Sequence, residues 1–247
     1  MTALLEVYGL GRRASVEART IVHQSDRSTV YRCQVPDLSR TVICKEPQGP
    51  TAGARLVHER RILKRLAGIE GIPTLDADAA TDGTLTFEDD GATPLHALLA
   101  VRRLVPAEVA AIGQGVARIL AAIHRLGVLH KDLNPSNILL QGEAIRPVLI
   151  DFDLATTFAE ERPGFTHHSE ITGTLGYLAP EQTGRMARPI DQRSDLYALG
   201  ITLYELATGE LPFRSNDALQ VIRDHLATVP VAPVRSEERR VGKECLE

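Results

Sequence analysis

The chain has 247 residues, of which 43% are hydrophobic and 24% are charged, values typical of a globular protein. This length suffices for one large domain or for a two-lobed unit with a cleft. The net charge of -4 is opposite in sign to that of most nucleic-acid-binding domains, so we expect no nucleic-acid partner.

The three cysteines, Cys33, Cys44 and Cys245, form no C-x-x-C pair, which argues against a zinc site or a disulfide framework. Cys33 and Cys44 would face each other across a hairpin, but free buried thiols are the favoured interpretation. The N-terminal sequence lacks the apolar stretch of a signal peptide, and no apolar run approaches the roughly 18 to 20 residues that span a bilayer. We therefore expect a cytoplasmic chain without a membrane segment, although a longer parent protein could be tethered.

Strand patterns dominate the first 90 residues. The expected strands lie at 16–23, 28–35 and 40–46, with a turn over 35–39. A helix follows, because four apolar residues share one helical face: Leu56, Ile62, Leu63 and Leu66. A second pair of strands is expected up to Glu88, joined by a turn at Asp82-Gly83.

Helical patterns replace the strand patterns after residue 91. Apolar residues recur with helical spacing, and we expect a long helix that begins at Pro106 and ends at Gly127. Two more helices are expected at 194–207 and 217–227.

These patterns together predict a strand-rich lobe over residues 1–90 and a helical lobe over 91–234, with a ligand cleft between them. Residues 235–247 are rich in charge and continue no apolar face. We therefore expect a non-native tail there and a helical lobe that is truncated at its C-terminus.

Two stretches in the helical half contain residues suited to phosphoryl transfer, VLHKDLNPSNILL (128–140) and VLIDFDLA (148–155). This reaction needs a base at the acceptor hydroxyl and metal ions on the phosphates. Asp132 suits the base, and Asn137, five residues later in the same loop, suits a metal. Asp151 follows an apolar run, which places its carboxylate at a strand end and makes it suitable for Mg²⁺.

Together the two stretches resemble the catalytic loop H-R-D-x-x-x-x-N and the D-F-G turn of the protein kinase family. The resemblance covers roughly residues 15–230 and implies the two-lobed α+β kinase fold, with a small antiparallel sheet and one helix in the N-lobe. It also implies ATP and Mg²⁺ as cofactors, Asp132 as the catalytic base, and Asn137 and Asp151 as metal ligands. The residues implied to bind the nucleotide are Val30, Ile43, Lys45, Glu59, Glu88, Asn137, Leu139 and Asp151.

Other matches to the family follow in the same order along the chain. Lys45 in V-I-C-K resembles the strand lysine that holds the α and β phosphates, and Glu59 resembles its ion-pair partner on the next helix. The run GTLGYLAPE (173–181) resembles the end of the activation segment, which shapes a groove for a protein substrate. In this run Thr174 would contact the catalytic base, and the arginine that normally pairs with Glu181 is missing.

The run SDLYALG (194–200) resembles the buried helix whose aspartate, here Asp195, hydrogen-bonds the backbone of the catalytic loop. His130 is expected to be structural and to pack with Leu63 and Phe152. Residues 176–200 resemble, more narrowly, the kinase domains at the start of large bacterial proteins that also contain an ATPase-like region and a sensor histidine kinase. Further domains of a longer polypeptide are therefore expected partners, beside a protein substrate with a Ser or Thr acceptor.

Several positions depart from the family pattern. The glycine-rich loop is replaced by HQSDRSTV (23–30), which has no glycine, so we expect a weaker or differently arranged grip on the phosphates. Val30 would still cover the adenine, whereas Ile43 replaces a small alanine and narrows the adenine pocket. Asn134 replaces a lysine at the transferring phosphate, and Asp153 replaces the glycine of D-F-G.

The activation segment contains Thr166, Ser169 and Thr172, where phosphorylation is an option. Lys131 stands where many kinases have the arginine that clamps such a phosphate. Because an ammonium binds phosphate with less geometric constraint than a guanidinium, we expect only a weak dependence of activity on this phosphorylation.

The favoured function is an ATP-dependent serine/threonine protein kinase, since Lys45, Glu59, Asp132, Asn137 and Asp151 are all intact. The alternative is a pseudokinase-like module that binds nucleotide and regulates attached domains, which the glycine-free loop favours. A small-molecule phosphotransferase on the same fold is disfavoured by the substrate-groove motif at 173–181.

Overall fold

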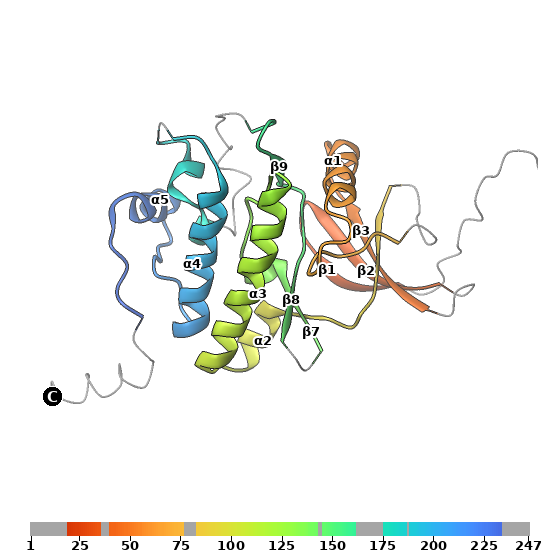
Figure 1. Cartoon of the computed structure of the whole chain (residues 1–247), viewed down its shortest axis with the longest axis horizontal. Coiled ribbons are helices and arrows are strands. Elements are labelled where there is room, and N and C mark those ends of the chain that lie inside the picture. Colours follow the sequence, from red (N-terminus) through yellow and green to blue (C-terminus); the bar gives the residue numbers. More distant parts are fainter. Residues whose placement is uncertain are drawn as a thin grey trace, which may run out of the picture. The chain divides into compact units, whose positions relative to one another are not determined.

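The computed structural model describes residues 19–35, 40–76, 83–142, 145–161, 175–186 and 188–233 (Figure 1). Contacts divide the chain into two compact units. The first comprises Met1–Arg60 and Thr74–Asp89, and the second comprises Arg61–Pro73 and Asp90–Glu247. Several predictions fall outside the described residues. They concern Thr174, the three candidate phosphorylation sites, Cys245, the tail at 235–247 and all of the predicted turn at 35–39 except Val35.

The first unit contains a four-stranded antiparallel sheet with the order β1-β2-β3-β4. Its strands are β1 (Arg19–Gln24), β2 (Ser28–Val35), β3 (Arg40–Pro47) and β4 (Leu85–Glu88). The three strands predicted before residue 47 are confirmed. Of the second predicted pair, β4 is present, and Leu75 forms a bridge with Phe87; most of the earlier strand and Asp82 of the predicted turn lie outside the described residues.

The two faces of this sheet differ in what they contain. Cys33 and Val42 lie opposite each other in the register of β2 and β3, and with Val35 and Cys44 they form a buried apolar cluster. Cys33 and Cys44 are free thiols, as predicted. Burial, together with contact from Cys33, raises the pKa of Cys44 to about 12. The opposite face contains the functional residues described below.

Helix α1 (Ala52–Arg65) follows β3, and its last turn belongs to the second unit. It buries Leu56, Ile62 and Leu63, which confirms the helical face predicted for this segment.

The second unit is mainly helical. Its helices are α2 (Leu95–Val101), α3 (Pro106–Arg125), α4 (Gln192–Thr208) and α5 (Ala218–Ala227). Its short strands are β5 (Thr93–Pro94), β6 (Val128–Leu129), β7 (Ile138–Gln141), β8 (Arg146–Leu149) and β9 (Thr156–Thr157). Helices α3 and α4 lie side by side and form the centre of the unit (Figure 1).

Helix α3 has clear signals at both ends. Pro106 stands at its first position, and the Glu108 carboxylate accepts a hydrogen bond from the Val105 N–H at 2.9 Å. Gly127 follows its end with φ +70°, a left-handed conformation that glycine adopts without strain. These signals explain why the bounds predicted for this helix, 106 to 127, agree with the structure to within two residues.

Helix α3 is also the one helix among the described residues that is long and apolar enough to cross a bilayer by length and composition. No such helix was expected from the sequence. The helix buries an apolar face made of Ile112, Val116, Ile119, Leu120 and Ile123 and packs on α4 and β8. A core helix passes the same test of length and composition, so this single helix is weak evidence for a membrane segment.

Candidate active site

The catalytic loop at residues 130–137 is anchored by Asp195, whose side chain is 1% exposed at the start of α4. Its Oδ2 accepts hydrogen bonds from the His130 N–H at 3.0 Å and from His124 Nε2 at 2.8 Å. Its Oδ1 accepts a bond from the Lys131 N–H at 2.8 Å. The predicted contact between Asp195 and the loop backbone is therefore present, and His124 is an additional partner that the sequence analysis did not identify.

His130 is fully buried, and its ring bonds to the backbone. Its Nε2 lies 3.0 Å from the Ile150 carbonyl oxygen, and its ring meets the ring of Phe152 edge-on at 4.9 Å between centroids. The Asp132 N–H donates to the other ring nitrogen at 3.3 Å. A ring with these contacts supports the loop, in keeping with the structural role expected for it.

The carboxylate of Asp132 is held by two side-chain amides. Asn137 Nδ2 donates to its Oδ2 at 2.9 Å, and Asn134 Nδ2 donates to its Oδ1 at 3.3 Å. Asn134 Oδ1 also accepts the Ser136 N–H at 2.8 Å, which caps the short 3₁₀ turn Pro135–Asn137. Asn134 therefore does more than replace a lysine, because its side chain orients the candidate base and closes the turn beside it.

The two candidate metal ligands lie in adjacent segments. The Ile150 N–H, next to Asp151, donates to the Asn137 carbonyl at 2.9 Å, and β7 and β8 pair with Ile138 opposite Leu149. Asp151 has φ +64°, a left-handed conformation that is uncommon outside glycine and clusters at functional sites.

Asp151 and Asn137 fit a magnesium ion bound together with a nucleotide. Both offer oxygen atoms, and Asn137 would ligate through Oδ1, because its Nδ2 makes both donated bonds. Among the described residues no group of three or more His, Cys, Asp or Glu side chains is placed to hold a metal. Mg²⁺ usually takes one or two protein ligands and completes its shell with phosphates and water, so two side chains with oxygen atoms suffice for it.

Asp153 occupies the position of the family's glycine. The described non-glycine residues with left-handed φ are Lys131, Ile145 and Asp151, so Asp153 needs no such conformation. Its N–H donates to Asp151 Oδ1 at 3.3 Å. The backbone at this position therefore accepts a side chain without a left-handed conformation.

In the first unit, Lys45 on β3 and Glu59 on α1 form a buried ion pair. Lys45 Nζ lies 2.7 Å from Oε2 and 2.8 Å from Oε1 of Glu59, and the two residues are 8% and 4% exposed. A charge-assisted pair with both oxygens engaged fixes the ammonium group in one position. The structure thus brings together the two residues that the family resemblance paired.

The register of the sheet places further candidate nucleotide contacts beside Lys45. Val30 lies directly opposite Lys45, and Ile43 is two residues before Lys45 on β3, so the three share one face. Phe87, which the sequence analysis did not single out, lies opposite Ile43 on that same face. The alternating pattern of β4 was the available signal for it.

The other two candidates have different positions. Glu88 lies opposite Val42, so its side chain is on the far face from Lys45, and it stands three residues along β4 from Leu85, the residue opposite Lys45. Leu139 belongs to the second unit, where it lies on β7 opposite Val148.

The turn between β1 and β2 closes on itself. The Ser25 N–H donates to the Ser28 carbonyl at 2.9 Å, and Ser25 Oγ accepts the N–H groups of Arg27 at 3.3 Å and Ser28 at 3.1 Å. In a glycine-rich loop such backbone N–H groups bind phosphate oxygens. Here they are already bonded within the turn, which gives a physical basis for the weak phosphate grip expected from the sequence.

Glu181 has a partner that the sequence analysis did not predict. The Ser194 hydroxyl donates to Glu181 Oε1, and this contact links the short turn Pro180–Thr183 to the first turn of α4. Among the described residues, Ser194 thus supplies a hydrogen-bond donor to this carboxylate. Gln182, the next residue, donates from Nε2 to the Lys131 carbonyl at 2.9 Å, so the turn also holds the catalytic loop.

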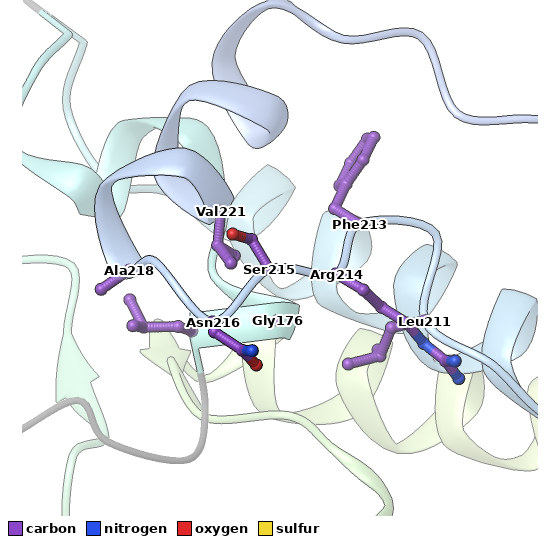
Figure 2. A pocket seen from close by; sticks show the side chains of 9 residues that line it. Gly176, Leu211, Phe213, Arg214, Ser215, Asn216, Ala218 and Val221 are labelled. Atoms are coloured by element: carbon purple, nitrogen blue, oxygen red, sulfur yellow. The ribbon is translucent and has the colours of Figure 1, made fainter.

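A hollow of about 600 Å³ lies beside the end of the activation segment (Figure 2). Leu175 and Gly176, from the run at 173–181, form part of its wall. Its other lining residues are Leu211, Phe213, Arg214, Ser215, Asn216, Ala218 and Val221. The wall combines apolar side chains with polar groups at Arg214, Ser215 and Asn216, a mixture that is common in ligand pockets.

A comparison with protein families matches residues 24–245 to the protein kinase domain, which is more than half of the chain. The fold of each unit and the order of the motifs agree with this match. The chain belongs to the protein kinase domain family.

Three curated relatives illustrate the similarity. The chain is 31% identical over 230 residues to the serine/threonine-protein kinase pkn3 of Myxococcus xanthus, a match covering 87% of this chain and 41% of that protein. It is 41% identical over 132 residues to the serine/threonine-protein kinase PkaA of Streptomyces coelicolor, covering 53% of this chain and 24% of that protein. It is 36% identical over 113 residues to the serine/threonine-protein kinase PknB of Mycolicibacterium smegmatis, covering 45% of this chain and 17% of that protein. The chain thus spans less than half the length of these relatives.

Proposed function

We propose that this chain transfers the γ-phosphate of MgATP to the hydroxyl of a Ser or Thr residue in a protein substrate. Protein kinases as a family use ATP with a divalent metal and act on proteins. The main support for phosphate transfer to a hydroxyl is the arrangement of Asp132, whose two carboxylate oxygens accept hydrogen bonds from Asn137 and Asn134. The names of the bacterial relatives support Ser and Thr as acceptors.

Each group in the site has a role in this proposal. Asp132 accepts the proton of the acceptor hydroxyl, because an oriented carboxylate within reach of that hydroxyl can act as a general base. Lys45, fixed by Glu59, binds the α and β phosphates. Asn137 and Asp151 hold Mg²⁺, which neutralises charge on the phosphate oxygens when it is bound.

The hollow in Figure 2 supports the choice of a polypeptide as substrate because Leu175 and Gly176, from the run that resembles the substrate-groove motif, line it. Attachment to further domains is a proposal that rests on the resemblance of residues 176–200 to bacterial hybrid kinases. A cytoplasmic location is also part of the proposal, since the reaction consumes ATP.

Two measurements test the proposed reaction. MgATP at millimolar concentration should raise the melting temperature of the wild-type chain, because a ligand that binds only the native state stabilises it. Asp132→Ala should keep this shift but lose phosphate transfer to a Ser/Thr peptide library by about 10²- to 10⁴-fold. A wild type that shows the shift but transfers no phosphate would favour the pseudokinase alternative, and a wild type without the shift would overturn nucleotide binding.

The closed turn at Ser25 gives a further test of the nucleotide site. Ser25→Gly removes the hydroxyl that occupies two N–H groups of the turn, so it should lower the Kd for MgATP. The Kd for adenosine, which has no phosphates, should stay within twofold. Equal changes for both ligands would show that the turn does not act on the phosphates.

A further inference from the structure

Lys131, the residue directly before Asp132, has its backbone fixed on both sides. Its N–H donates to Asp195 Oδ1 at 2.8 Å, and its carbonyl accepts from Gln182 Nε2 at 2.9 Å. Its φ of +69° lies in the left-handed region, which a side chain makes unfavourable. Such a conformation persists where the surroundings hold it, and a relaxation at Lys131 would rotate the peptide that leads to Asp132.

The side chain of Lys131 has a third contact. Its Nζ donates to Glu161 Oε2 at 2.9 Å, and the Thr156 hydroxyl donates to the same oxygen at 2.6 Å. The two charged side chains are only 18% and 10% exposed, so solvent screens this pair less than an exposed one. Thr156 lies on β9, where it pairs with Leu129, the residue before His130. Glu161 is thus fixed relative to the strand that leads into the catalytic loop.

The neighbouring carboxylate has a different environment. Glu160 forms an ion pair with Arg61, and these side chains are 43% and 50% exposed. Its Oε2 also accepts the hydroxyl of Thr157 at 2.9 Å. Exposed pairs of this kind contribute little to stability. Glu160 therefore offers a control of equal charge, one residue away, that does not touch the catalytic loop in any contact described above.

We propose that Glu161 is a positioning residue for phosphate transfer, which holds Lys131 and through it the backbone that carries Asp132. This inference rests on the proposed function. A carboxylate of the chain itself neutralises the cation beside the base, so the loop is held without a phosphate group on the activation segment. Phosphorylation at Thr166, Ser169 or Thr172 would then change activity little, because the site that a phosphate would bind is already filled.

The test compares Glu161→Gln with Glu160→Gln and the wild type, using a Ser/Thr peptide library and MgATP. Glu161→Gln keeps the shape and removes the charge, and we expect kcat to fall at least tenfold, which is about 1.4 kcal/mol in the barrier. The KM for MgATP should stay within twofold, since Glu161 acts on the base and not on the nucleotide. Glu161→Asp should recover part of kcat, and Glu160→Gln should keep kcat within twofold of the wild type.

A double-mutant cycle tests whether Glu161 acts through Lys131. If it does, adding Glu161→Gln to Lys131→Gln lowers kcat no further than Lys131→Gln alone. If the two decreases in kcat multiply in the double variant, Glu161 and Lys131 act independently, and the inference is overturned. Phosphatase treatment of the wild type should leave kcat within threefold, and a loss above tenfold would overturn it as well.

The remaining outcomes separate this inference from the proposed function. An active wild type with an equally active Glu161→Gln variant overturns the inference alone. A Glu161→Gln variant that has no cooperative melt shows that Glu161 serves folding and not positioning, which also overturns it. A wild type that transfers no phosphate overturns the proposed function, and the inference fails with it.

Discussion

Replacing Asp195 by asparagine should destabilise the second unit and impair the catalytic loop together. The carboxylate accepts three hydrogen bonds, from the backbone of His130 and Lys131 and from His124. Asparagine keeps one acceptor oxygen, which can serve the two donors at Oδ2. Its amide group then faces the Lys131 N–H, so two donors meet and neither has an acceptor.

The expected cost follows from these contacts. A buried N–H without a partner costs about 1 to 3 kcal/mol. The two remaining bonds change from charge-assisted to neutral, and neutral bonds have roughly half the strength. We therefore expect Asp195→Asn to lower the free energy of unfolding by about 2 to 4 kcal/mol, a large part of the roughly 5 to 15 kcal/mol that stabilises a domain.

The assay is urea unfolding followed by far-UV circular dichroism, with linear extrapolation to water. Asp191→Asn is a matched control on the same helix, because Asp191 is the more exposed N-cap of α4 and asparagine caps a helix equally well. It should cost less than about 1 kcal/mol. The reasoning is refuted if Asp195→Asn costs no more than this control.

Two further predictions concern the helices of the second unit. Hydrogen bonding from Arg102 lowers the pKa of Glu108 from 4.5 to about 2. The contribution of Glu108 to stability is therefore fully present above pH 4.5 and is lost as the pH falls through 2. The difference in melting temperature between wild type and Glu108→Gln should be largest near neutral pH and should shrink steadily between pH 4.5 and pH 2. Gly115→Ala should lower the free energy of unfolding by about 1 to 3 kcal/mol, because the new Cβ would lie 2.3 Å from Cγ of the rigid Pro147 ring. Gly200→Ala places its Cβ in open space on α4 and should raise the free energy of unfolding by up to about 1 kcal/mol. Chemical denaturation of both glycine variants checks this prediction, and a change of the same sign in both free energies of unfolding would contradict it.

Elements with a strong local pattern were predictable from the sequence. Helix α3 has an apolar stripe of helical spacing between a proline and a glycine, and β2 and β3 are runs of β-branched residues, so local rules sufficed for both. The shortest strands were missed for the opposite reason. Strands of two residues, such as β5 and β9, are too short to show a period, and they form because a partner strand lies beside them.

The candidate catalytic residues could be named from the sequence for a different reason. Asp132, Asn137 and Asp151 lie in one loop and one strand end, and their spacing is set by the local chain. The partner of Lys45 was also expected, since the order of strand, helix and loop matches the protein kinase family, and the structure forms that pair. Sequence alone therefore determined the family and the residue types of the candidate site.

The tertiary structure decided which groups support those residues. Glu161 and Lys131 are 30 positions apart, and Asp195 and His130 are 65 positions apart. The contact between Asp195 and His130 was expected only from the family resemblance, and the contact between Glu161 and Lys131 was not expected. A hydrogen bond between distant residues depends on the orientation of both backbones and on the exclusion of water, and neither is encoded in local spacing. For that reason the residues that perform the proposed chemistry were visible in the sequence, whereas the contacts that orient them emerged only from the folded chain.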